Sequence, residues 1–316
     1  MTDTTIAPAA AAAPPAAPKK PSLRKRLPKF SVLFAAVWVI GLTILTLLAN
    51  YLPSALPFLR EYGAKVKLHG RAKSYGWGPG WNAWWGTGKS SEDIFARCIY
   101  GAKATILIGI GATIFGLIVG GILGILSGYF QGWTDRVGSI ITDCLLSIPP
   151  LLLALILILR LDDLKQQYSF IGWLTRGWQI TLTLGLVAVA PFARIVRAQT
   201  MALREREFVT AARSLGASRS RIMVRELLPN LVPAMVTVAF TGLGLLIAAE
   251  AGLAFLGLGI EKPYTWGKMI DIARDDIEKH YWATVFPCIM LFITVLSFNL
   301  LGDELARRFD IREAAV

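Results

Sequence analysis

The sequence is poor in charged residues and in the side chains that bind metals or form disulfides. Charged residues make up only 17% of the 316 residues, while hydrophobic residues make up 54%. Three cysteines and two histidines lie far apart along the chain, at Cys98, Cys144, Cys288, His69 and His280. Their spacing fits neither a disulfide framework nor a set of metal ligands. These scarcities argue against a soluble domain and predict a chain without a metal site.

The sequence contains several long runs of apolar residues without charged side chains. A helix needs roughly 20 apolar residues to cross the hydrocarbon core of a bilayer, where its backbone groups must all be satisfied within the helix. The sequence therefore predicts an all-α membrane protein with about six transmembrane helices. The apolar runs cover residues 31–50, 103–129, 138–160, 177–195, 229–249 and 281–302.

The formal net charge of +12 indicates how these helices are oriented. A charge of this size also suits a protein that binds nucleic acid. Here, however, the basic residues cluster beside the apolar runs, where Lys and Arg orient helices and contact anionic lipid headgroups. We therefore expect membrane lipid as a partner and no nucleic acid. The arginine-rich loop 194–226 is predicted to be cytoplasmic, and the acidic stretch 250–280 is predicted to be external.

These assignments predict a multi-pass protein of the cytoplasmic membrane with both termini in the cytoplasm. They divide the chain into a few segments. The expected segments are a disordered basic N-terminus over 1–30, a first transmembrane helix over 31–50, an external loop over 51–100, a five-helix core over 101–302 and a cytoplasmic tail over 303–316.

Glycines recur at every fourth position in the second apolar run. Gly116, Gly120 and Gly124 would lie on one helix face, where the absence of side chains lets a neighbouring backbone approach closely. This spacing predicts a helix-packing seam. The alternative is the general enrichment of glycine in membrane helices.

Two acidic residues and a proline pair are candidates for a solute pathway. Pro149 and Pro150 in the third run remove helix hydrogen bonds and are predicted to kink or break that helix. Asp143 lies about two turns earlier, and a carboxylate at membrane depth normally faces the bundle interior or a cavity. Asp143 has either a structural hydrogen-bonding role or a substrate-lining role. Glu250 ends the fifth run, where it either lines a substrate exit or supports helix packing.

The loop between the fourth and fifth runs has the most informative local pattern. Gly216 can take the left-handed conformation that ends a helix, and Ser218 can cap the next helix. The sequence therefore predicts a short helix, a tight turn and a second helix that project into the cytoplasm. The first helix would present one apolar face, made by Phe208, Ala211, Ala212 and Leu215.

Two other interpretations of this loop deserve comparison. A DNA-binding helix-turn-helix has a similar pattern, but a unit held between two membrane spans lacks the third helix and the free dimer geometry of such modules. A basic loop that only contacts anionic lipid remains an open alternative.

The same loop resembles the cytoplasmic "EAA" loop of binding-protein-dependent ABC importers. Thr210 replaces the usual Glu of that motif. Three further segments, within 86–101, 250–267 and 299–310, are similar to the dipeptide and oligopeptide permeases of this group. The motif positions that match are Ala211, Ala212, Gly216, Leu228 and Pro229.

This resemblance implies the type I ABC importer permease fold and a permease subunit that carries di- or oligopeptides. It implies a heterodimer with a second permease, two cytoplasmic P-loop ATPase subunits that bind ATP and Mg, and an external substrate-binding protein. A coupling helix within 207–222, part of the cytoplasmic loop 194–228, would contact the ATPase. The implied coupling residues are Phe208, Ala211, Ala212, Leu215, Gly216, Arg219, Leu228 and Pro229.

The chain itself is predicted to have no catalytic residues and no bound cofactor. Residues 85–90 look like the end of a phosphate-binding loop, but Ala83 stands where that motif needs a glycine. A secondary transporter is the main alternative, although it usually has internal repeats and several midplane charges. A membrane enzyme is the weakest alternative, because no catalytic constellation is found.

Overall fold

A computed structural model describes residues 30–49, 51, 67–68, 71–72, 78–81 and 83–313. The predicted disorder of 1–30 therefore lies almost entirely outside the described residues, as does most of the expected external loop before residue 78. Nearly all of the described chain is helical. The rest includes loops over 83–93 and 259–265 and one small antiparallel strand pair, β1 (Lys67–Leu68) and β2 (Arg71–Ala72).

Five described helices are long and apolar enough to cross a membrane, and a sixth span results if one sharply bent pair is counted together. This agrees with the all-α prediction of about six transmembrane helices. The main helices are α1 (Phe30–Leu48), α3 (Ile94–Phe130), α4 (Gly132–Ser147), α5 (Pro150–Gln167), α6 (Arg176–Arg204), α7 (Glu207–Ser214), α8 (Arg219–Arg221), α9 (Leu228–Leu253), α10 (Trp266–Ala273) and α11 (Trp282–Glu313).

Several helices extend beyond the apolar runs that predicted them. The side chain of Asp93 caps the start of α3 by accepting hydrogen bonds from the backbone N–H groups of Phe95 and Ala96, so this helix begins well before residue 103. Helix α11 continues through 303–313, where the sequence predicted a tail. Hydropathy marks only the part of a helix that lies in lipid, and helices continue into water where caps and packing support them.

The third predicted span is not one continuous helix. Helix α4 ends at Ser147, Pro149 and Pro150 begin α5, and the two helices are bent by 93°. Neither proline can donate a backbone hydrogen bond, and a proline ring clashes with the carbonyl group four residues earlier in a helix. The predicted break at the proline pair is therefore confirmed, and the run 138–160 is divided between the two helices.

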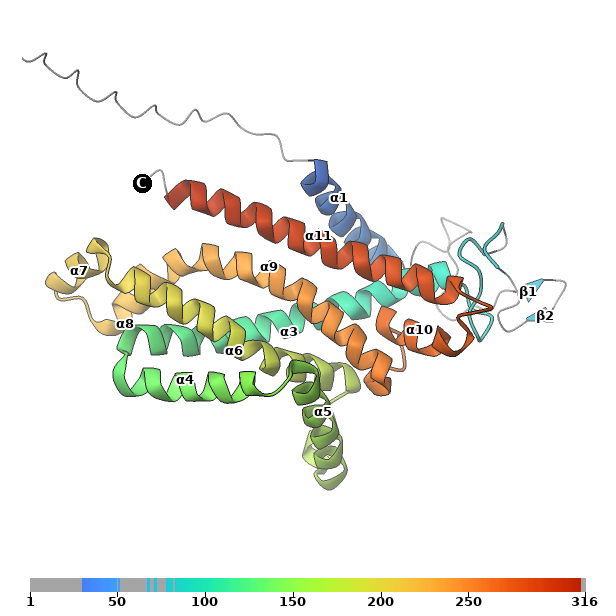
Figure 1. The fold of residues 1–316 in the computed structure, drawn as a ribbon, viewed down its shortest axis with the longest axis horizontal. Helices are drawn as coiled ribbons and strands as arrows, with labels where there is room; N and C mark the ends of the chain where they lie inside the picture. Colours follow the sequence, from blue (N-terminus) through green and yellow to red (C-terminus); the bar gives the residue numbers. More distant parts are fainter. Residues whose placement is uncertain are drawn as a thin grey trace, which may run out of the picture.

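Helices α3 and α6 pack side by side and form the centre of the molecule, and α9 and α11 pair beside them (Figure 1). Helix α1 packs on α11, and α5 projects away from the long axis. The central core is made by buried apolar residues that include Ile108, Ala112, Ile180, Leu184 and Phe192.

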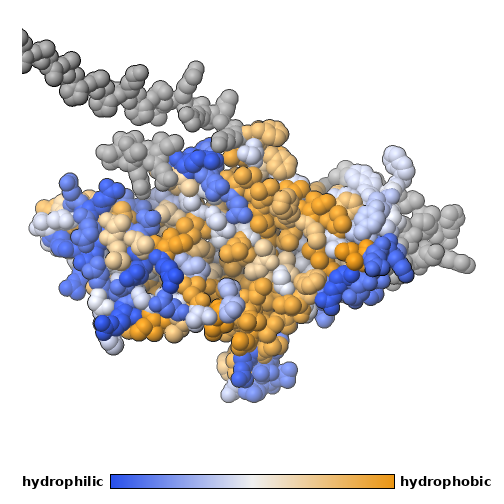
Figure 2. All heavy atoms as spheres, in the orientation of Figure 1, coloured by the Kyte–Doolittle hydropathy of each residue, from blue (hydrophilic) through white to orange (hydrophobic). Residues whose placement is uncertain are grey.

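The two ends of the molecule differ from its middle. Figure 2 shows hydrophobic side chains gathered over the middle of this face and hydrophilic side chains at both ends, as expected for a protein that crosses a bilayer. Helices α7 and α8 lie at one end together with the C-terminal end of α11 (Figure 1). Helix α10 and the β1–β2 pair lie at the opposite end.

The α10 end is held together by tryptophans. Trp266 is fully buried, and its indole Nε1 donates a 2.8 Å hydrogen bond to the carbonyl oxygen of Cys98 on α3. Trp85 stacks on Phe286 of α11 with 4.7 Å between ring centroids. Trp81 is 99% exposed. Tryptophan at this end thus serves packing between helices as well as the exposed surface.

Candidate functional site

The segment that joins α6 to α9 forms a rigid protrusion at one end of the molecule. Helix α7 ends in a tight turn in which Gly216 has φ +78°. The backbone N–H of Ala217 bonds to the carbonyl of Ala212, and that of Gly216 bonds to the carbonyl of Arg213, each at 3.0 Å. This is the Schellman arrangement, which satisfies the last carbonyls of a helix. The predicted left-handed cap at Gly216 is therefore confirmed.

The second helix of the protrusion continues directly into a transmembrane helix. The side chain of Ser218 accepts a hydrogen bond from the backbone N–H of Arg221, as predicted for a cap. From Arg219 the chain stays helical through α8, the π-helical turn η2 (Ile222–Leu227) and α9 as far as Leu253. The widened turn comes just before Pro229, whose ring would crowd the carbonyl of Arg225 in a regular helix. No loop therefore separates the protrusion from α9.

The apolar face of α7 is divided between the interior and the surface. Val209 is fully buried, and Phe208 and Ala212 pack against the cluster around it, which includes Ile222 and Leu227. Leu215 is 88% exposed, and Ala211 beside it on the helix is also exposed. The sequence analysis missed Val209 and placed Leu215 on the same face as Phe208. An eight-residue helix has too few turns for its pattern to decide which face is buried.

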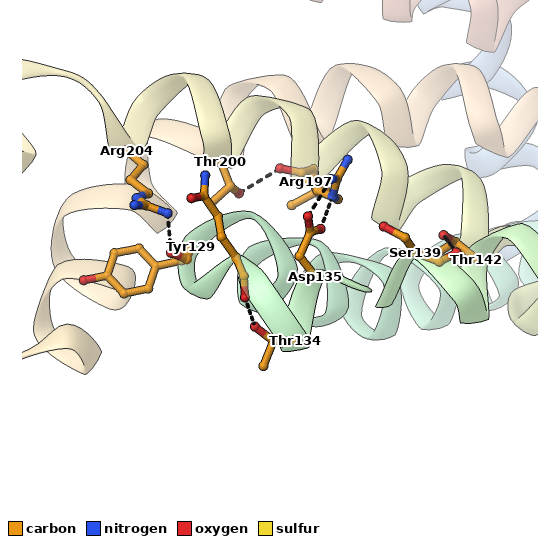
Figure 3. Close-up of polar contacts among 10 residues, drawn as sticks. Tyr129, Thr134, Asp135, Ser139, Thr142, Arg197, Thr200 and Arg204 are labelled. Atoms are coloured by element: carbon orange, nitrogen blue, oxygen red, sulfur yellow. Dashed lines mark hydrogen bonds and ion pairs between the residues drawn. The ribbon is translucent and has the colours of Figure 1, made fainter. Parts of the chain in front are cut away.

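A second polar region lies along the contact between α4 and α6. Arg197 on α6 donates hydrogen bonds from Nε and Nη2 to the two carboxylate oxygens of Asp135 on α4, the second at 2.8 Å. Arg204 donates from Nη1 to the backbone carbonyl of Tyr129, at 2.9 Å (Figure 3). That carbonyl belongs to the last turn of α3 and has no partner within the helix. Arginines of α6 thus bind both neighbouring helices.

Asp143 takes part in the same polar region. Its Oδ1 accepts a 2.7 Å hydrogen bond from Nη2 of Arg194. The sequence analysis placed Arg194 and Arg197 in a loop, but α6 continues to Arg204, so both lie within the helix. Their spacing of three residues puts them on one helix face, a signal that could have indicated an ion-pair row. The partner Asp135 was missed because it lies between two apolar runs.

The glycines of the second run lie against α6. A Cβ atom at Gly120 would be 2.6 Å from the carbonyl oxygen of Val189, and one at Gly124 would be 2.6 Å from that of Ala193. A Cβ atom at Gly116 would be 2.8 Å from the Cβ atom of Ala188. Contacts this short leave no room for a side chain. The spacing of four residues thus brings the backbones of α3 and α6 together and fixes α6 next to α4.

Glu250 is fully buried in α9 near the α10 end. The Thr265 side chain is close enough to interact with the carboxyl group, but neither carboxyl oxygen has a hydrogen-bond partner within normal geometry among the described residues. Glu250 therefore does not line an open exit in this conformation. Its charged form would be costly without a partner.

No group of three or more His, Cys, Asp or Glu side chains in the described part of the chain is arranged to hold a metal ion. The sites present are therefore a protruding helical turn at one end and a row of interhelical ion pairs. The protruding turn is suited to contact with a partner protein, and the ion pairs are suited to holding helices together or contacting a solute.

Comparison with known proteins identifies the family. Residues 120–313 match the family model described as "Binding-protein-dependent transport system inner membrane component". The chain belongs to this family. Its members are the permease subunits of ABC importers, in which separate subunits hydrolyse ATP and a binding protein delivers the substrate. The chain is accordingly a multi-pass membrane permease without an ATPase site of its own.

Curated relatives match over most of the chain. A dipeptide transport system permease protein DppC from Alkalihalophilus pseudofirmus is 35% identical over 234 residues, which cover 74% of this chain and 73% of the relative. A glutathione transport system permease protein GsiD from Pectobacterium atrosepticum is 33% identical over 74% of each chain. A GsiD protein from Escherichia coli O1:K1 is 36% identical, over 74% of this chain and 73% of that protein.

Solved structures agree on the fold. An inward-facing structure of the MetNI methionine ABC transporter contains a chain that matches with a TM-score of 0.57 and 21% identity. The match covers 69% of this chain and 99% of the MetNI chain. At this identity the likeness concerns the fold alone, and it confirms the type I ABC importer permease fold predicted from the sequence.

Proposed function

We propose that this permease imports short peptides, through a pathway that it forms with a second, homologous permease subunit. The proposal is supported by the curated relatives, whose names refer to dipeptide and glutathione transport. Glutathione is itself a short peptide. The exposed ion pair between Arg194 and Asp143 gives further support, because charged side chains within membrane helices normally face protein or a water-filled cavity.

The α7 end of the molecule is cytoplasmic in this proposal, and the α10 end is external. The arginine-rich segment 204–226, which begins at the last residue of α6, supports the orientation, because cytoplasmic loops carry an excess of Lys and Arg. The last turns of α11 lie at the same end as α7, in agreement with a cytoplasmic C-terminus (Figure 1). The segment 250–280 then contacts the external binding protein.

The coupling segment 207–222 docks on a cytoplasmic P-loop ATPase subunit that binds ATP and Mg. The observation that carries this step is Leu215, a large apolar side chain that is 88% exposed on a rigid turn outside the membrane-spanning part of the fold. Exposed apolar side chains of this kind are typical of contact sites. Because the chain is helical without a break from Arg219 to Leu253, closure of the ATPase pair on ATP would move α9 and switch the pathway between inward- and outward-facing states.

The proposal can be tested by purifying the complex in mild detergent and measuring its ATPase activity and peptide uptake after reconstitution. Wild-type permease should bring down two ATPase subunits and a second permease. Leu215→Asp should lose the ATPase subunits while remaining in the membrane, because it places a charge in an apolar contact. Trp81→Asp changes a similarly exposed apolar residue at the opposite end and should retain them. A permease purified alone that moves solute under an ion gradient would contradict the proposal.

A further inference from the structure

We infer that the cleft between α4 and α6 is a transit site for the carboxylate group of the solute, with Arg194 as the residue that binds it. The inference rests on the peptide-import function proposed above. The cleft has a volume of about 170 Å³. Its polar lining is made by Ser127, Ser139, Thr142, Asp143, Arg194 and Arg197.

The exposure of the ion pair at this cleft indicates that the surface faces water or another protein. The side chains of Arg194 and Asp143 are 59% and 63% exposed, although both lie in helices of the membrane-spanning region. Arg194 lies ten residues before the end of α6 at Arg204, which is roughly 15 Å along a helix. A charged pair held this far from the helix end is costly in contact with lipid. A water-filled solute pathway avoids this cost, and in the inference the cleft lies against it.

Arg194 and Arg197 differ in how many of their N–H donors form hydrogen bonds. Arg197 is bound through two nitrogens to both oxygens of Asp135, so it acts as a structural clamp. Arg194 makes a single hydrogen bond to Asp143 among the described residues, through Nη2. A guanidinium group has five N–H donors, arranged to bind a carboxylate through two parallel bonds. Arg194 thus retains the donors needed for a second carboxylate.

Hydroxyl groups add to the donors around Arg194. Thr142 donates to the backbone carbonyl of Ser139, at 2.9 Å, while the Ser139 hydroxyl has no hydrogen bond within the described part of the protein. The missing side chain at Gly138 leaves the space that the Ser127 hydroxyl occupies. The Arg194 guanidinium and the Ser139 hydroxyl therefore keep N–H and O–H donors that an anionic group in the cleft can accept.

The neighbouring acid would keep such binding weak. Asp143 competes with the solute carboxylate for Arg194 and repels it. A transport pathway requires a solute to enter a site and to leave it again, so tight binding would slow transport. An arginine that is already paired with one exposed aspartate meets this requirement.

The first experiment measures peptide uptake by the whole complex in liposomes. We expect Arg194→Gln to lower uptake roughly tenfold or more while the complex still assembles. The swap of Arg194→Asp with Asp143→Arg restores an ion pair, and we expect it to restore stability but not uptake. Arg160→Gln removes another exposed arginine with an acidic neighbour, on α5, and should leave uptake unchanged. Full uptake by the swapped variant would mean that the pair is only structural and would overturn the inference.

A second experiment detects the solute in the cleft directly. Ser139→Cys, in a chain whose exposed Cys144 and Cys288 are replaced by serine, gives a thiol in the cleft for labelling by a water-soluble reagent. We expect a dipeptide with a free carboxylate to slow labelling during transport, and the same dipeptide with a C-terminal amide to have little effect. Labelling that responds only to the content of anionic lipid would assign the site to a lipid phosphate and overturn the inference.

The two proposals fail in different ways. A wild-type complex that imports no peptide would contradict the proposed function. A wild-type complex that imports peptides, with Arg194→Gln importing them equally well, would contradict only the inference about the cleft.

Discussion

Arg197 of α6 holds Asp135 of α4 through two parallel hydrogen bonds, although both residues lie outside the apolar runs of the sequence. Both side chains are partly shielded, with 33% and 22% of their surface exposed. The pair is a bidentate contact of the kind that combines strength with a fixed geometry. It joins α4 to α6, which run side by side in opposite directions (Figure 1).

Asp135→Asn should destabilise the permease because it leaves the Arg197 guanidinium without a charged partner. Hydrogen bonds to charged groups contribute about 1.5–3 kcal/mol, so we expect a loss of about 2 kcal/mol. The thermal unfolding midpoint in detergent measures it. Glu304→Gln is the control, because among the described residues Glu304 pairs only with Arg307 and Arg308 of its own helix. Equal losses of stability in the two variants would mean that the Asp135–Arg197 pair between helices stabilises the protein no more than an ion pair within one helix.

Gly120→Ala should separate α3 from α6. The added Cβ atom would lie 2.6 Å from the carbonyl oxygen of Val189, and a backbone atom cannot move aside alone. Overpacking of this kind costs about 1–3 kcal/mol. Gly41→Ala on α1 meets no atom of the described residues within 4 Å and should be neutral or stabilising, since alanine is the better helix former. The thermal unfolding midpoints of the two variants are compared. An unchanged midpoint in Gly120→Ala would mean that α3 and α6 do not pack closely at this position.

Thr105→Val should weaken the contact between α3 and the start of α10. The Thr105 hydroxyl accepts a hydrogen bond from the backbone N–H of Trp266, at 3.2 Å, in a fully buried position. Valine keeps the shape but leaves that N–H unsatisfied, at a cost of about 1–3 kcal/mol. Thr113→Val is the matched control, because that hydroxyl only donates to Gly109 within its own helix. A smaller unfolding shift for Thr105→Val than for Thr113→Val would contradict this account.

Gly216→Val should impair coupling between ATP hydrolysis and transport. Nothing lies within 4 Å of a Cβ atom at this position, so the cost comes from the backbone at φ +78° and not from a clash. The left-handed conformation costs L-residues about 1–2 kcal/mol, and a β-branched residue fits it poorly. Asparagine tolerates this conformation, so Gly216→Asn should retain coupling. The ratio of peptide transported to ATP hydrolysed distinguishes the variants, and equal ratios would show that the turn is dispensable.

The sequence predicted the features that depend on local chemistry. Hydropathy located the membrane helices because lipid requires each span to satisfy its own backbone. The turn at Gly216 and the cap at Ser218 were predictable because each depends on a few adjacent residues. The break at Pro149 and Pro150 was predictable for the same reason, but its angle was not, since packing on α6 and α9 determines the direction of α5.

The contacts between helices could not be predicted from a single sequence. Asp135 and Arg197 lie 62 positions apart, and only the packing of α4 on α6 brings them together. Asp143 has an ion-pair partner, Arg194, that the sequence analysis placed in a loop. The burial of Val209 in preference to Leu215 depends on where α9 begins, so it too is decided by tertiary structure.

The central claim is that the turn after α7 contacts the ATPase subunit, and photo-crosslinking from position 215 tests it most directly. A photoreactive phenylalanine analogue is placed at 215 in the whole complex, and at 81, also exposed but at the opposite end, as the control. The account predicts a covalent product with a P-loop ATPase subunit from position 215 and none from position 81. Crosslinks from 215 that reach only lipid, in a complex that still hydrolyses ATP and imports peptide, would contradict it.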